Sequence, residues 1–185
     1  SKIAKVDLTA GKVLEEISTG PGPWGARLSY DETKLYVADK GETGGYGQQG
    51  RTLTIVDTAI PIVTNVVLIG VTTDHAILSP DGKEVWATSN AERGIWVIDT
   101  ATEKVTATIK MPNDGDTHGS TFVRYEKDAK DQILGTVVSS FTGLRGPARA
   151  EQLKAIAQSK APLVKASPRG TGFDPQTLKL PAGKQ

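Results

Sequence analysis

The two histidines of this chain are the residues whose type and position could do chemistry. His75 and His118 lie 43 positions apart, and aspartates accompany them at Asp74 and Asp116. Imidazole nitrogens bind transition metals, and a neighbouring carboxylate can orient each ring. The pair could hold a metal ion, or it could face a tetrapyrrole or a substrate. The metal site stays one alternative among these, because a catalytic zinc usually has three protein ligands and the sequence has only two histidines.

A repeated pattern decides where these histidines must lie. Three apolar runs end in aspartate, at residues 3–7, 53–57 and 95–99, and a second β-rich run follows each of them. Between them, residues 28–38 match residues 78–88, and the spacing of the repeat is 42 to 50 residues. Repeats of this length with four short strands each are typical of β-propeller blades. The predicted fold is therefore an all-β propeller.

The repeat predicts two complete four-stranded blades and parts of two more. Its strands are expected at residues 2–7 and 12–18 of a first, incomplete blade; at 26–30, 34–38, 52–56 and 63–69 of blade two; at 76–79, 84–88, 94–98 and 104–110 of blade three; and at 120–124 and 132–139 of a fourth blade. A closed propeller needs about four to eight blades. We therefore expect the remaining blades to come from further sequence or from another chain.

The strand order of a propeller places both histidines at one channel mouth. Each histidine lies in the connection from the outer strand of one blade to the innermost strand of the next. The loops between the second and third strands of a blade lie on the same face. Concave mouths of this kind are where ligands bind. The candidate ligand or metal residues at this mouth are His75, His118, Asp74, Asp116, Arg93 and Trp24.

A long glycine-rich loop of blade two is expected at the same face. It spans residues 41–51 and accounts for the extra length of that repeat. It lacks the Lys-Ser or Lys-Thr ending and the following helix of a phosphate-binding loop. A flexible insertion is the favoured interpretation, and a partner-contacting loop with Tyr46, Gln48 and Arg51 is the alternative.

The aspartates that end the apolar runs are better explained by structure than by catalysis. Asp7, Asp57 and Asp99 recur at the same point of every repeat, ahead of a turn. A carboxylate in this position can accept backbone N–H groups of the turn. We therefore predict that they are turn caps.

Composition excludes several classes of protein. The 185 residues include 22 basic and 21 acidic side chains, for a net charge of +1, and no cysteine. Nothing in this balance indicates nucleic-acid binding, and disulfides and thiolate sites are ruled out. No apolar run reaches the length of a membrane span. Because the chain begins at Ser1, inside an expected strand, we expect processing or a longer protein.

The repeat resembles the YVTN family of β-propellers. The resemblance rests on residues 79–83 (Ser-Pro-Asp-Gly-Lys), 85–90 and 96–105, with a looser copy at 28–38 and 53–63. The resemblance implies a periplasmic or extracellular protein. The members of the family include binding proteins. Proteins with d1 haem and nitrous-oxide reductase carry related propellers, and the d1-haem propellers place two histidines on adjacent blades in a similar way. In YVTN-type repeats, however, a histidine before the innermost strand often only hydrogen-bonds neighbouring loops, and this structural role is the favoured one for His75 and His118.

The last residues resemble the opening strand of a cupredoxin, the copper electron-transfer fold. Phe173, Pro175, Leu178 and residues 181–183 (Pro-Ala-Gly) match it. The resemblance implies a copper site in a downstream domain, whose ligands are absent from this chain. It also implies the domain order of nitrous-oxide reductase, although the histidine-rich propeller site of that enzyme is missing here.

The domains expected are a partial propeller at 1–142, a short helix and linker at 143–172, and the start of a cupredoxin-like domain or a terminal arm at 173–185. The helix is predicted over residues 147–160. The first functional hypothesis is a non-catalytic periplasmic or extracellular scaffold that docks a protein partner within a redox assembly. The alternative is part of a metal- or d1-haem-type redox enzyme that uses the histidine pair. Neither hypothesis identifies a cofactor, and copper and haem are the two considered.

Overall fold

The computed structural model describes residues 1–41, 49–127, 129–130 and 133–137. The chain divides into two compact units, the first at Ser1–Ser120 and the second at Thr121–Gln185. In the described residues the secondary structure consists of β-strands and one 3-10 turn at Pro112–Asp114. The predicted all-β character is confirmed for this part of the chain.

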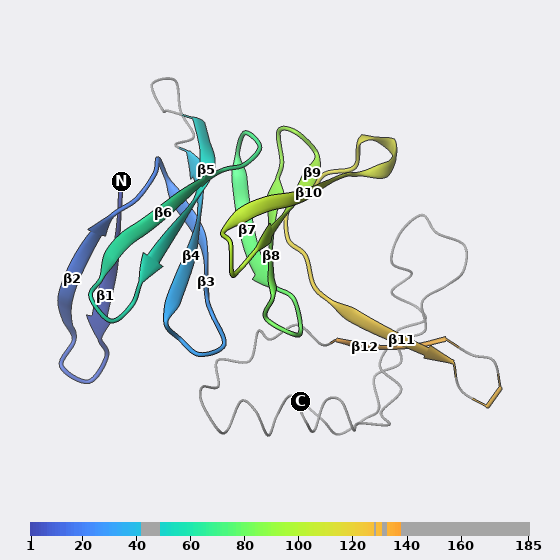
Figure 1. Cartoon of the computed structure of the whole chain (residues 1–185), viewed down its shortest axis with the longest axis horizontal. Coiled ribbons are helices and arrows are strands. Elements are labelled where there is room, and N and C mark those ends of the chain that lie inside the picture. The colour runs from blue at the N-terminus through green and yellow to red at the C-terminus, as the bar shows by residue number, and fades with distance from the viewer. Residues whose placement is uncertain (42–48, 128, 131–132, 138–185) are drawn as a thin grey trace. The chain divides into compact units, whose positions relative to one another are not determined.

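The first unit consists of three antiparallel sheets whose strands follow one another in sequence order (Figure 1). The first sheet has β1 (Lys2–Asp7) and β2 (Lys12–Ser18); the second has β3 (Pro23–Leu28), β4 (Lys34–Gly41), β5 (Gln49–Asp57) and β6 (Ile62–Leu68); the third has β7 (Thr73–Leu78), β8 (Glu84–Ser89), β9 (Gly94–Asp99) and β10 (Lys104–Lys110). The strands expected for the incomplete first blade and for blades two and three are all present in these sheets. The two four-stranded sheets correspond to the two predicted complete blades.

The core lies between the second and third sheets. Alternate side chains of a strand point to opposite faces, so each sheet turns one apolar set toward the other. The second sheet and the residue after it supply Tyr36, Leu53, Ile55, Val67 and Ile69, and the third supplies Ala76, Leu78, Val85, Ala87 and Ile98. Strands β3 and β4 pack directly against β7. The innermost strand of the third sheet is therefore held against the second sheet, and this contact positions the site described below.

The predicted turn caps are confirmed at all three aspartates. Asp7 Oδ1 accepts the backbone N–H groups of the second and third residues after it, at 2.8 and 3.0 Å. Asp57 Oδ1 does the same at 2.8 and 3.1 Å, and Asp99 Oδ1 at 3.1 and 2.7 Å. Hydrogen bonds from the backbone N–H and hydroxyl of Thr102 lower the pKa of Asp99. These carboxylates are occupied by their own turns.

The second unit contains an antiparallel pair, β11 (Val123–Lys127) and β12 (Ile133–Val137). These strands fall within or beside the segments expected to begin a fourth blade. The predicted helix at 147–160, the linker and the cupredoxin-like segment at 173–185 lie outside the described residues. In the part of the chain that is described, no helix is long and apolar enough to cross a membrane.

Candidate functional site

A β-bulge at the start of β7 presents the first two site residues. Thr73 pairs with Ser89 and Ala76 pairs with Ala87, so Asp74 and His75 are the residues within the irregularity. A bulge increases the local twist and redirects side chains, and bulges are frequent beside functional sites. The second sheet has the same irregularity between Pro23 and Ala26, where Trp24 and Gly25 occupy the corresponding positions.

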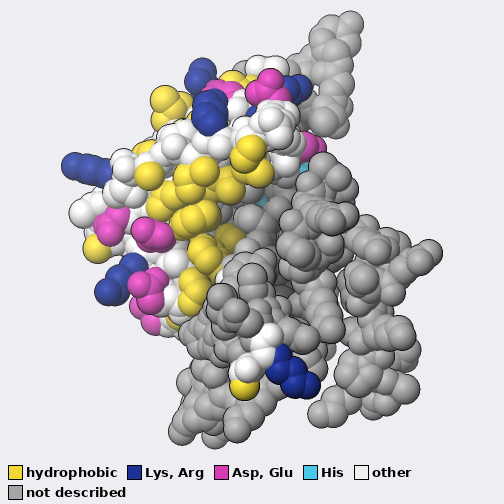
Figure 2. Space-filling model, turned by 90° about the vertical axis from the view of Figure 1, so that its right-hand side faces the viewer, with side chains coloured by type: hydrophobic (Ala, Val, Ile, Leu, Met, Phe, Trp, Pro, Cys, Tyr) yellow, Lys and Arg dark blue, Asp and Glu magenta, His cyan; other side chains and the backbone are white. Residues whose placement is uncertain are grey.

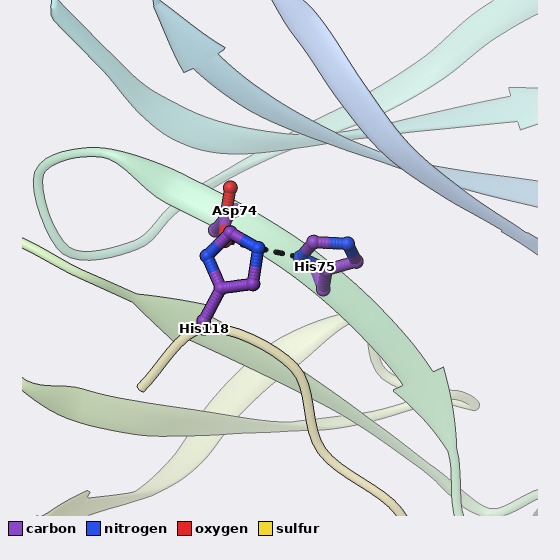
Figure 3. Close-up of side chains that lie close together, drawn as sticks. All are labelled: Asp74, His75 and His118. Carbon is purple, nitrogen blue, oxygen red and sulfur yellow. Dashed lines mark ion pairs between the residues drawn. The ribbon is translucent and has the colours of Figure 1, made fainter. Parts of the chain in front are cut away.

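The Asp74 carboxylate contacts both imidazoles, and Figure 3 shows the three side chains close together. Its Oδ2 atom is 3.1 Å from Nδ1 of His75 and 2.7 Å from Nδ1 of His118. The two rings are tilted by 60°, with their centroids 5.0 Å apart. One ligand atom from each of the three residues lies within 4.8 Å of the others. Residues from β7 and from the segment after β10 therefore meet at one point.

A cation from the neighbouring sheet balances the charge of Asp74. Lys40, at the end of β4, places Nζ 2.6 Å from Asp74 Oδ1. The same ammonium lies 4.5 Å from the centre of the Trp24 ring, a cation–π contact. The side chain of Asp74 is fully buried, whereas His75 is 30% and His118 is 60% exposed. The charge of the carboxylate is thus buried, and both imidazoles beside it are partly exposed to solvent.

The polar atoms at the centre of this cluster are not satisfied by hydrogen bonds. Both carboxylate oxygens of Asp74 and Nδ1 of His75 are buried and have no hydrogen-bond partner. The contacts around Asp74 are therefore close polar contacts that lack hydrogen-bond geometry. Buried polar atoms without a partner are uncommon in native proteins and call for an explanation, such as an ion that binds there.

Thr88 holds the backbone of both histidines. It lies on β8 with 1% of its surface exposed. Its Oγ1 accepts the N–H of His75 at 3.1 Å and donates to the carbonyl of His118 at 2.8 Å. One hydroxyl therefore ties the segment after β10 to the bulge of β7, and Thr88 is a positioning residue.

Gly25 allows the second sheet to approach the bulge closely. A Cβ atom at this position would lie 2.8 Å from the carbonyl oxygen of Asp74 and 3.0 Å from Cα of His75. Both neighbours are backbone atoms, which cannot move aside without displacing β7. Gly25 therefore helps to fix the position of β7, and with it the site, against the second sheet.

The other predicted site residues are spread around this centre. Asp116 accepts a hydrogen bond from Asn90 Nδ2 at 2.8 Å, and the same amide is 3.5 Å from Nδ1 of His118. Arg93 pairs with Asp114 at 3.4 Å, and both side chains are more than half exposed. Trp24 contacts Lys40, the cation beside Asp74. Arg51 is exposed on β5, and Tyr46 and Gln48 lie outside the described residues.

Sequence analysis missed Lys40 and treated Asn90 only as a loop residue. The two occupy equivalent positions, because the Lys40 N–H donates to the Gly22 carbonyl and the Asn90 N–H donates to the Thr72 carbonyl at the same point of successive repeats. Each side chain reaches toward the following repeat, Lys40 to Asp74 and Asn90 to His118. Aligning residues 38–40 with 88–90 would have found both.

Comparisons with known proteins identify the fold. No protein-family model and no curated protein matches the chain. Among solved structures, hydrazine synthase of Kuenenia stuttgartiensis is similar at 21% identity and a TM-score of 0.52, over 77% of this chain and 39% of that one. A functionally unknown protein from Desulfotomaculum acetoxidans is similar at 15% identity and a TM-score of 0.53, over 73% and 46% of the two chains. The dihydro-heme d1 dehydrogenase NirN in complex with DHE is similar at 14% identity and a TM-score of 0.50, over 74% and 28%.

The described chain thus spans less than half of the length of each of these structures. Hydrazine synthase and NirN are β-propeller proteins from redox systems. Their identities to this chain are low, so the likeness concerns the fold. Together with the consecutive antiparallel sheets, it shows that the chain has a propeller-like β architecture.

Proposed function

We propose that this chain is part of a periplasmic or extracellular β-propeller that serves as a binding subunit of a larger redox assembly. Two structural neighbours, hydrazine synthase and NirN, support the redox context, and the YVTN-like repeat supports the location. A protein partner, or further blades of the propeller, would complete the assembly.

The outer edge of the second sheet carries this proposal. Among the strands that the structure describes, β6 is at the edge of its sheet and pairs with β5, and its sequence, IVTNVVL, has no charged residue. Ile62, Val66 and Leu68 are 49, 53 and 63% exposed. The outer strands β2 and β10 instead carry lysine or glutamate. Edge strands are normally protected by charge, so an uncharged and apolar one indicates a contact surface for another protein.

Exposed apolar side chains occur on a second face as well. Figure 2 shows a band of hydrophobic side chains across the face that it draws. The outer strand β10 contributes partly exposed Val105 and Ile109 to the protein surface. More than one side of the first unit is thus suited to contact with protein.

Introducing charge at the edge tests the docking role. We expect Val66→Lys with Leu68→Lys to prevent co-purification of a partner, while Ala10→Lys, in the exposed turn between β1 and β2, leaves it unchanged. Cross-linking followed by mass spectrometry would locate the wild-type contact on β6. A wild-type protein that stays a lone, stable monomer at all concentrations would contradict the proposal.

The cluster of Asp74, His75 and His118 favours a second function, a redox site that holds a metal or a d1-haem-type tetrapyrrole. Its support is a buried carboxylate facing two accessible imidazoles. The absorption spectrum and the metal content of the purified protein test it. Equal metal and haem content in the wild type and in His75→Ala with His118→Ala would remove this function.

A further inference from the structure

We infer that Asp74, His75 and His118 together bind one divalent first-row transition-metal ion, with the carboxylate and both imidazoles as ligands. The inference deepens the second function proposed above and rests on it, because it names the ligand class of that site. Three observations lead to it: the convergence of the donor atoms, their missing hydrogen bonds, and the open side of the cluster.

The donor atoms converge at distances close to those of a metal polyhedron. Ligand atoms about 2.0–2.2 Å from a tetrahedral zinc lie about 3.3 Å from one another. In this cluster Oδ2 of Asp74 is 3.1 Å from one imidazole nitrogen and 2.7 Å from the other. The whole set lies within 4.8 Å, so a modest rotation of the rings closes it around an ion.

The directions of these contacts also agree with a metal site. In a metal site each donor atom points at the metal and not at the other donors. Contacts between ligands are then short but lack hydrogen-bond alignment, as is found here for Oδ2 of Asp74 and for Nδ1 of His75. A hydrogen-bonded Asp–His pair would have satisfied these buried atoms.

The site is accessible on one side and adaptable. His118 is the most exposed ligand, and it lies in a segment without regular structure between β10 and β11. It can therefore adjust to an ion without a change in the sheets. Three protein ligands that leave a position open are typical of catalytic zinc sites, and two histidines with one carboxylate also suit non-haem iron.

Lys40 shapes the charge of the site. Its ammonium occupies Oδ1 of Asp74 and leaves Oδ2, the atom nearest both imidazoles, for the metal. The carboxylate is thus held as a ligand with a single oxygen. A tetrapyrrole fits this arrangement less well, because the donor atoms point to a common centre and not to a flat surface.

Metal titration tests the inference. The protein is stripped with a chelator and titrated with Co²⁺, whose visible absorption reports nitrogen and oxygen ligands, and then with Zn²⁺ by calorimetry. We expect one equivalent of Co²⁺ that Zn²⁺ displaces, and a rise in the melting temperature with Zn²⁺. His75→Ala and His118→Ala should each weaken Zn²⁺ binding by about 100-fold, and Asp74→Asn by at least about tenfold.

The matched control is Asp114→Asn, which removes an exposed carboxylate at the same face and should bind Zn²⁺ like the wild type. Because His118 is largely exposed, His118→Ala should fold normally, and its melting temperature without metal checks this. A wild type that binds no metal, or three variants that bind as the wild type does, would overturn the inference. If haem binds and metal does not, the inference fails and the proposed redox site stands; if neither binds, both fail.

Discussion

At the scale of single residues, Asp74 has the most demanding environment of the site. Its fully buried carboxylate has an ammonium on one oxygen and two imidazoles on the other. A buried charge is tolerated when it is paired, and removal of a partner leaves an uncompensated charge. The stability of the folded protein should therefore depend on Lys40 as well as on any bound ion.

Lys40→Met should lower the free energy of unfolding by about 2–3 kcal/mol, because Asp74 then lacks its cation. Zn²⁺ should restore more stability to this variant than it adds to the wild type, since the ion supplies the missing positive charge. Urea unfolding with and without Zn²⁺ measures both effects. The control is Lys2→Met, whose ion pair with Glu16 is exposed on both sides and should change stability by less than about 0.5 kcal/mol. Equal losses in the two variants would contradict the prediction.

Asp39 leads to a different prediction, because its buried carboxylate is held by threonine hydroxyl groups. Its Oδ2 accepts hydrogen bonds from Thr52 and Thr54, both at 2.7 Å. Burial nevertheless raises the pKa of Asp39 above its ordinary value. The folded state therefore binds this proton more tightly than the unfolded state does, and stability falls as the pH rises through the raised pKa.

Asp39→Asn should remove the loss of stability that ionisation of Asp39 causes. We expect the variant to be more stable than the wild type at neutral pH, by about 1 kcal/mol, and less dependent on pH above the ordinary value of 3.8. Asp31→Asn should act in the opposite sense, because a hydrogen bond from Ser29 lowers the pKa of Asp31 and its contribution is lost as the pH falls. Thermal melts between pH 2 and pH 8 compare the two. A wild-type pH dependence retained by Asp39→Asn would refute the assignment.

The roles of some of these residues could be predicted from the sequence, and the roles of others could not. Turn aspartates could be predicted because a local hydrogen-bonding role depends only on neighbouring residues. The proximity of His75 to His118 could be expected from strand order alone. The role of Lys40 and the burial of Asp74 could not, because both depend on how closely one sheet packs on the next.

At the scale of elements, the bulges of β3 and β7 explain why the starts of these strands could not be predicted from the sequence. Both strands begin three residues earlier than the alternation of apolar residues predicts, at Pro23 and Thr73. A bulge breaks the alternation, so the residues before it do not look like a strand in the sequence. The site residues Asp74 and His75 lie in this hidden portion.

Gly25→Ala should disturb the site through the backbone of β7. Its Cβ would meet the Asp74 carbonyl and the His75 Cα, so β7 must shift or the sheets must separate. We expect a loss of about 1–3 kcal/mol in stability and weaker metal binding. Gly119→Ala is the matched control, since nothing lies within 4 Å of its Cβ position. Isothermal calorimetry and urea unfolding would show the difference, and similar behaviour of both variants would exclude a role for close packing.

At the scale of the whole molecule, the contact between the second and third sheets organises the first unit. Apolar side chains fill most of it, the ion pair of Lys40 with Asp74 lies at one end, and further polar contacts lie at the other. The Tyr30 hydroxyl donates to the Ser79 carbonyl at 2.8 Å, and Lys34 pairs with Glu103. These pairs join turns of successive repeats on the side of the strands away from the histidines.

Tyr30→Phe should lower the free energy of unfolding by about 1 kcal/mol, the usual net value of a hydrogen bond. Leu53→Ala, in the middle of the apolar contact, should cost about 2–5 kcal/mol. Both should shift one cooperative transition of the first unit, as followed by tryptophan fluorescence in urea. Two separate transitions in the wild type would show that the sheets fold independently.

The fold of the first unit was thus predictable because the repeat encodes each strand locally and the strands pair with their sequence neighbours. The cupredoxin-like tail and the predicted helix remain predictions, since they fall outside the described residues. Blade number is not encoded in any one repeat, because it depends on the angle between neighbouring sheets.

The chain of contacts from Lys40 through Asp74 to His118 has an evolutionary consequence. Each of three successive repeats supplies one of these groups, Lys40 from the second sheet, Asp74 from the third and His118 from the segment that follows it. Propellers change size by duplication or loss of whole repeats. Insertion or deletion of one repeat at this point would separate the ammonium from the carboxylate, or the carboxylate from the imidazole, even if the ring closed again. Selection on the cluster would therefore preserve the order of these repeats and confine changes in repeat number to other parts of the gene.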